Sequence, residues 1–122
     1  MKLKSGLIGL AAALLFAGVA NAGTMRVVVV ETSDVAAYVK ALEAGKALLK
    51  KKGSPSELKV WIARFAGTEA GSVAVTIEYP SLEALAKDDA MMRGDAELSA
   101  WLGSLSKIRK IVSDSIYEEL KP

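Results

Sequence analysis

The sequence contains no cysteine, no histidine and no glutamine, and its single asparagine is Asn21. Without cysteine the chain forms no disulfides and has no thiolate nucleophile or thiolate metal ligand. Without histidine it also lacks the commonest general base and the commonest transition-metal ligand. We therefore expect no metal site and no nucleophile activated by an imidazole.

A strong charge of one sign is lacking as well. The whole chain has 16 lysines and arginines against 14 acidic residues. Lys2 and Lys4 belong to the N-terminal leader described next, and without them the two signs are equal in number. Nucleic-acid binding needs a basic surface or stripe, so we expect no nucleic-acid partner.

The N-terminal segment combines Lys2 and Lys4, an uncharged stretch and the triplet Ala20-Asn21-Ala22. This arrangement is typical of a secretory signal peptide with an A-x-A cleavage site. We predict a signal peptide over residues 1–22, cleavage near Ala22, and a periplasmic or secreted protein with no stable membrane association after cleavage. The alternative is a retained membrane anchor, since residues 5–25 are long enough to span a bilayer.

Residues 23–122 form one predicted domain. Thr32, Ser33 and Asp34 offer N-cap oxygens for a first helix, Gly53 ends it, and Ser81 and Asp95 are N-caps for two later helical segments. The predicted strands are residues 26–30, 58–66, 72–79 and 111–120, and the predicted helices are residues 35–52, 82–92 and 96–108. The order is βαββαβ with a split second helix, which predicts an α+β ferredoxin-like fold with a four-stranded antiparallel sheet.

The helices of this fold cover one face of the sheet and leave the other open. Segments 27–30 and 60–65 are apolar or aromatic on both sides, so we predict that both are central strands with two covered faces. A second copy of the chain is the simplest cover for the open face, and we expect a homodimer.

Residues 23–122 resemble a known family over essentially their whole length, and one stretch carries the likeness most clearly. A strand ends in Ile77-Glu78-Tyr79 and runs directly into Pro80-Ser81-Leu82 at a helix start. The polar break Arg93-Gly94-Asp95 follows, and then a helix that carries Trp101. The domain resembles the dimeric α+β barrel superfamily, which includes antibiotic-biosynthesis monooxygenase-like and stress-responsive barrel domains.

The resemblance implies two sheets packed face to face in a dimeric barrel, with a pocket between sheet and helices in each subunit. Haem-degrading members of the superfamily use an asparagine, a tryptophan and a histidine haem ligand. This chain has no histidine, and its asparagine lies in the predicted leader. We therefore expect no haem and no other cofactor.

Two groups of residues are candidates for ligand binding. Arg64 and Glu78, near Lys59, provide a polar pair for an anionic ligand group, or alternatively an ordinary cross-strand ion pair. The aromatic residues either line an apolar ligand cavity or belong to the core; they are Trp61, Phe65, Tyr79 and Trp101. We select Trp61, Arg64, Glu78 and Trp101 as the predicted ligand-binding residues.

Acidic residues cluster in the second half of the chain, but their spacing does not match a calcium-binding loop. We interpret them as a solvated helix face. They are Glu83, Asp88, Asp89, Asp95 and Glu97.

These observations favour a homodimer that binds a small, largely apolar molecule without catalysis. One alternative is a cofactor-independent monooxygenase or isomerase in which Glu78 acts as the base. The other is a structural or stress-related dimer that has no ligand.

Overall fold

The structure is a computed structural model that describes residues 23–64, 67 and 71–121. The predicted signal peptide, residues 1–22, and Phe65 lie outside the described residues. The elements are β1 (Thr24–Glu31), α1 (Val35–Lys51), β2 (Glu57–Ile62), β3 (Val73–Tyr79), α2 (Leu82–Gly94), α3 (Ala96–Leu105) and β4 (Lys110–Glu118).

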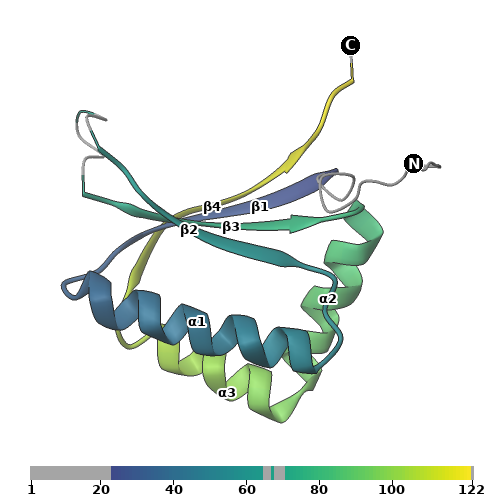
Figure 1. Cartoon of the computed structure of the whole chain (residues 1–122), viewed down its shortest axis with the longest axis horizontal. Helices are drawn as coiled ribbons and strands as arrows, with labels where there is room; N and C mark the ends of the chain where they lie inside the picture. The colour runs from purple at the N-terminus through teal and green to yellow at the C-terminus, as the bar shows by residue number, and fades with distance from the viewer. Residues whose placement is uncertain (1–22, 65–66, 68–70, 122) are drawn as a thin grey trace.

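The strands form one antiparallel sheet in the order β2-β3-β1-β4. The helices lie together on one side of this sheet, and the other side carries no helix (Figure 1). This arrangement confirms the predicted ferredoxin-like fold, including the division of the second helical region into α2 and α3.

Side chains at the helix ends explain where the helices begin and stop. Asp34, Ser81 and Asp95 each accept a hydrogen bond from a backbone N–H in the first turn of α1, α2 and α3. Beyond α1, Gly53 has a φ of 85°, a left-handed conformation that glycine adopts without steric cost. Asp34 is one of the three N-cap candidates that the sequence offered, and Gly53, Ser81 and Asp95 act as predicted.

The prediction of two central strands was right for β1 and wrong for β2. β1 and β3 occupy the middle of the sheet, whereas β2 is an edge strand that ends at Ile62. On β2, Leu58 is buried toward the helices, but Trp61 is 52% exposed. The prediction for β2 assumed that aromatic side chains such as Trp61 are covered, but an edge strand leaves Trp61 exposed. The edge position of β4 was predicted correctly.

The core lies between the sheet and the helices, where Tyr38, Leu42, Leu98 and Leu105 are almost fully buried. Helices α1 and α3 approach closely at Gly45, because a Cβ atom there would lie 1.9 Å from the Trp101 ring. No helix in the described ranges is long and apolar enough to cross a membrane.

Candidate functional site

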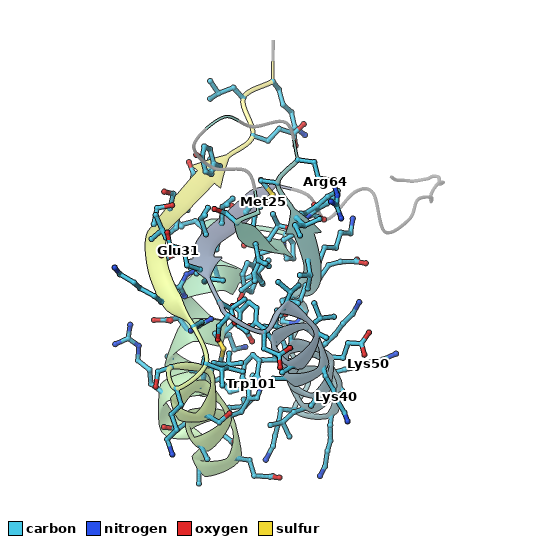
Figure 2. All side chains as sticks on the ribbon, turned by 90° about the vertical axis from the view of Figure 1, so that its left-hand side faces the viewer. Met25, Glu31, Lys40, Lys50, Arg64 and Trp101 are labelled. Atoms are coloured by element: carbon cyan, nitrogen blue, oxygen red, sulfur yellow. The ribbon has the colours of Figure 1, made fainter. Side chains whose placement is uncertain are left out.

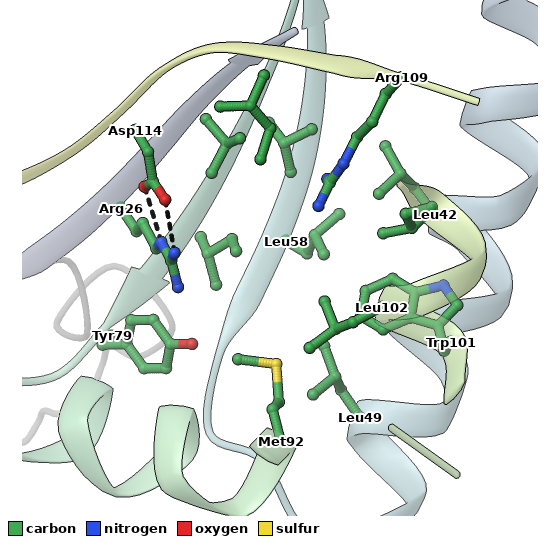
Figure 3. Close-up of a pocket in the computed structure, with 15 residues that line it drawn as sticks. Arg26, Leu42, Leu49, Leu58, Tyr79, Met92, Trp101, Leu102, Arg109 and Asp114 are labelled. Carbon is green, nitrogen blue, oxygen red and sulfur yellow. Dashed lines mark hydrogen bonds and ion pairs between the residues drawn. The ribbon is translucent and has the colours of Figure 1, made fainter. Parts of the chain in front are cut away.

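A cavity of about 70 Å³ lies between the helix-facing side of the sheet and the helices (Figure 3). Its walls come from all three helices, all four strands and the connection between α3 and β4. Most of the lining side chains are apolar; they include Val28, Leu42, Leu49, Leu58, Val75, Ile77, Met92, Trp101, Leu102, Leu105 and Ile111.

Trp101 forms a rigid part of this apolar wall. Its indole N–H donates a 2.9 Å hydrogen bond to the carbonyl oxygen of Ala41, which fixes the ring against α1. Trp101 lies among the helices, whereas Arg64 lies beside the sheet, away from Trp101 (Figure 2). Gly45 makes the ring position sterically feasible, since any side chain there would collide with it.

Arg26 and Asp114 supply a charged pair on the cavity wall. The Nε and Nη2 atoms of Arg26 donate hydrogen bonds of 2.9 and 2.6 Å to the Asp114 carboxylate (Figure 3). A second carboxylate, that of Asp89, lies 3.5 Å from Arg26. The hydrogen bonds from Arg26 lower the pKa of Asp114, and the same pairing raises the pKa of Arg26.

A β-bulge in β4 explains why Ile111 and Asp114 share this wall. The register between β1 and β4 shifts at Val29/Val30, where Ser113 pairs with Val29 but Ile111 pairs with Val30. Residues three apart on a regular strand point to opposite faces. The extra residue in β4 lets Ile111 and Asp114 both face the cavity.

Arg109 reaches into the cavity from the connection between α3 and β4 (Figure 3). Its Nη1 donates a 3.0 Å hydrogen bond to the Tyr38 hydroxyl, and its guanidinium carbon lies 5.9 Å from the centroid of the Tyr38 ring. Its Nε atom is buried and has no hydrogen-bond partner among the described residues. The second arginine of the cavity is therefore held by the hydroxyl and the ring of Tyr38.

Tyr79 lines the cavity and is tied to a buried acid behind it. The Tyr79 hydroxyl donates a 2.9 Å hydrogen bond to Asp88 Oδ2, and Ser54 Oγ donates another of 2.9 Å to the same oxygen. Burial, and secondarily the bond to Asp88, raises the pKa of Tyr79 well above its ordinary value. This hydroxyl stays protonated at neutral pH and is a hydrogen-bond donor.

The predicted ligand-binding residues lie on different sides of the sheet. Trp101 lines the cavity. Trp61 lies on the open face, where its indole N–H donates a 2.8 Å hydrogen bond to Thr76 Oγ1. Glu78 is on the same open face with one carboxylate oxygen 3.9 Å from Lys59 Nζ, the cross-strand ion pair that was the alternative interpretation. Arg64 is exposed beyond the end of β2.

Sequence reasoning missed the polar residues of the cavity, which are Arg26, Arg109 and Asp114. Arg26 alternates with Val28 and Val30, so its inward direction could have been read from the strand pattern. The inward direction of Asp114 depends on the register between β1 and β4, which one sequence does not specify. The described residues include no cluster of three or more acidic side chains suited to a metal ion.

No protein-family model matches the sequence, and no curated protein matches it. Solved structures do match it. SnoaB, a cofactor-independent oxygenase from Streptomyces nogalater, is 10% identical, with a TM-score of 0.56 over 83% of this chain and 97% of SnoaB.

Two proteins of Agrobacterium tumefaciens match similarly. A NIPSNAP family protein is 14% identical, with a TM-score of 0.58 over 82% of this chain and 87% of its own. A second protein, also 14% identical, has a TM-score of 0.63 over 80% of this chain and 94% of its own. At these identities the likeness establishes the fold alone. The chain has the ferredoxin-like fold of the dimeric α+β barrel proteins.

Proposed function

We propose that residues 23–122 form an exported homodimer that binds a small, largely apolar molecule in the cavity between sheet and helices. The observation that carries the proposal is the composition of this cavity. Its walls are mostly aliphatic and aromatic side chains, with a few polar groups that converge on it from Arg26, Tyr79, Arg109 and Asp114. Ligand sites in proteins commonly combine these features.

The cavity volume limits the size of the ligand. At about 70 Å³ it accommodates only a few heavy atoms without movement of side chains. The wall beside β4 is less enclosed, since Ile111 is 47% exposed there. A longer molecule extends toward β4, or displaces Met92, whose unbranched side chain adapts readily.

We infer a homodimer from the apolar side chains on the open face of the sheet. Val27 and Val29 are only half-buried in a single chain, and Trp61 and Tyr117 are exposed. A second copy packed on this face would bury these side chains together. The resemblance of the sequence to the dimeric α+β barrel superfamily supports the same assembly.

Native mass spectrometry of the protein recovered from the exported fraction tests the proposal. We expect a chain that begins at Gly23, a dimer, and an added mass that denaturation removes. Leu102→Trp should abolish the added mass by filling the cavity, and Ala100→Trp, on the exposed side of α3, should retain it. An unprocessed chain contradicts export, a monomer contradicts the dimer, and an added mass that survives in Leu102→Trp contradicts the cavity as binding site.

An oxygenase of the SnoaB type is the second candidate, because SnoaB has the same fold. Asp114 is the one carboxylate among the described residues that line the cavity, and its pKa is lowered by Arg26, which makes it a weak base. Glu78 could act only on a substrate bound at the open face. Turnover that Glu78→Gln abolishes while the dimer persists would favour this alternative over simple binding.

A further inference from the structure

The charge of Arg109 is not neutralised at close range. None of the ion pairs within 4.0 Å in the described part of the chain includes Arg109. Asp114 acts on it only through longer-range attraction, because that carboxylate is hydrogen-bonded to Arg26. A buried donor without an acceptor is unfavourable, so an acceptor supplied to Arg109 Nε would be bound with a gain in free energy.

The cavity itself shows how such an arginine holds a carboxylate. Arg26 grips Asp114 with Nε and Nη2, the side-on pair of guanidinium donors. On Arg109, Nη1 is the nitrogen that has a hydrogen-bond partner, the Tyr38 hydroxyl. This bond anchors the guanidinium and leaves Nε and Nη2, the same side-on pair, for a ligand.

The charged side chains that line the cavity determine which ligand charge it favours. Among the described residues, Arg26, Arg109 and Asp114 are the charged side chains that line the cavity. Asp114 is paired with Arg26, so Arg109 supplies the positive charge that is not neutralised at close range. The other described wall residues are mainly apolar and provide no further cation for a dianion. We infer that the cavity binds amphipathic monoanions, namely short-chain carboxylates, with the carboxylate on Arg109 and the hydrocarbon chain against Leu42 and Trp101. This inference rests on the proposed binding function.

Calorimetric titration at pH 7 with butyrate, hexanoate, butanamide and hexanamide tests the inference. The dependence of affinity on chain length reports on the apolar cavity. The ratio of the affinity for an acid to the affinity for its amide, the acid-to-amide ratio, reports on Arg109. We expect hexanoate to bind more tightly than butyrate, by up to about fourfold per methylene. We expect each acid to bind about tenfold more tightly than its amide, as a charge-assisted hydrogen bond predicts.

Two variants locate the effect. Arg109→Gln should reduce the acid-to-amide ratio to about one and leave the chain-length dependence intact. Lys107→Gln removes the same charge from an exposed site nearby and should preserve both. If Arg109→Gln does not fold, Arg109→Lys keeps the charge but lacks the planar fork, and its acid-to-amide ratio should fall below that of the wild type.

The possible failures are distinct. Equal affinity for acids and amides in the wild type, with a chain-length dependence, overturns the inference and leaves the binding function standing. An acid-to-amide ratio that Lys107→Gln lowers as much as Arg109→Gln also overturns it, because the effect is then one of net charge. Absence of binding by all four compounds overturns the inference, and the proposed function is then decided separately by the added mass in the native spectra.

Discussion

At the scale of single residues, Asp88 connects three segments of the chain through hydrogen bonds that the sequence did not indicate. It was interpreted as part of a solvated helix face, but it is 3% exposed. Its Oδ2 accepts hydrogen bonds from Ser54, in the connection after α1, and from Tyr79, at the end of β3. Acidic side chains are rarely buried unless they are partnered, and here two hydroxyl donors provide the partners.

Asp88→Ala should lower the free energy of unfolding by about 2 kcal/mol, since two donors lose their shared acceptor. Urea unfolding followed by circular dichroism measures the change. Lys87→Ala, at the exposed neighbouring position of α2, should stay within about 0.5 kcal/mol of the wild type. Equal effects of the two substitutions would show that the Asp88 hydrogen bonds do not stabilise the fold.

At the scale of elements, two contacts shape the cavity. Helices α1 and α3 meet where Trp101 packs on Gly45. Strands β1 and β4 are joined beside the cavity by the Arg26–Asp114 pair. The first contact is steric, so a change in side-chain size tests it. The second is electrostatic, so loss of a charge and a change in pH test it.

Gly45→Ala should destabilise the protein by about 1–3 kcal/mol, because the new methyl group forces the Trp101 ring out of its position. This loss occurs although alanine favours a helix more than glycine does. Gly103→Ala in α3 meets no atom within 4 Å and should instead stabilise by about 0.5–1 kcal/mol. Thermal unfolding of both variants provides the comparison, and two stabilised variants would contradict the close approach of α1 and α3.

Asp114→Asn should lower the free energy of unfolding at neutral pH by about 1 kcal/mol, a small value because solvent screens this partly exposed pair. The lowered pKa of Asp114 means that the pair stabilises above the unfolded-state pKa and loses this effect as pH falls through the folded-state pKa. Urea midpoints of wild type and variant should therefore converge as the pH falls below the ordinary range of an aspartate pKa. Glu118→Gln, at the exposed end of β4, should lack this pH-dependent difference.

At the scale of the whole molecule, the helices cover one face of the sheet and solvent meets the other (Figure 1). The uncovered face mixes half-buried valines with the exposed rings of Trp61 and Tyr117. Exposed apolar patches of this kind commonly mark protein–protein contacts.

Val27→Lys places a charge at the middle of this face and should convert the proposed dimer into a monomer, since an unpaired charge at an interface is costly. Light scattering coupled to gel filtration measures the mass. Ala44→Lys, on the exposed side of α1, should leave the mass unchanged. A wild type that is already monomeric, or a Val27→Lys dimer, would contradict packing through the open face.

The sequence was most informative where structure is local. The caps at Asp34, Ser81 and Asp95 depend on neighbouring residues, and each was predicted correctly. The cavity depends on pairings that a single sequence does not specify. Asp114 lies on the same face as Arg26 because it pairs with Val28 in the register of β1 and β4, and Arg109 is recognisable as a ligand group only once Tyr38 is seen to hold it.

The sheet topology has a further consequence for how the chain acquires its structure. β1 lies between β3 and β4, and Thr24 pairs with Glu118 across nearly the whole described chain. Contacts between such distant positions require closure of a long loop, which slows folding. In a chain that is still being synthesised, the edge of β1 that pairs with β4 stays unpaired until β4 emerges, so folding of the domain is coupled to completion of its last strand.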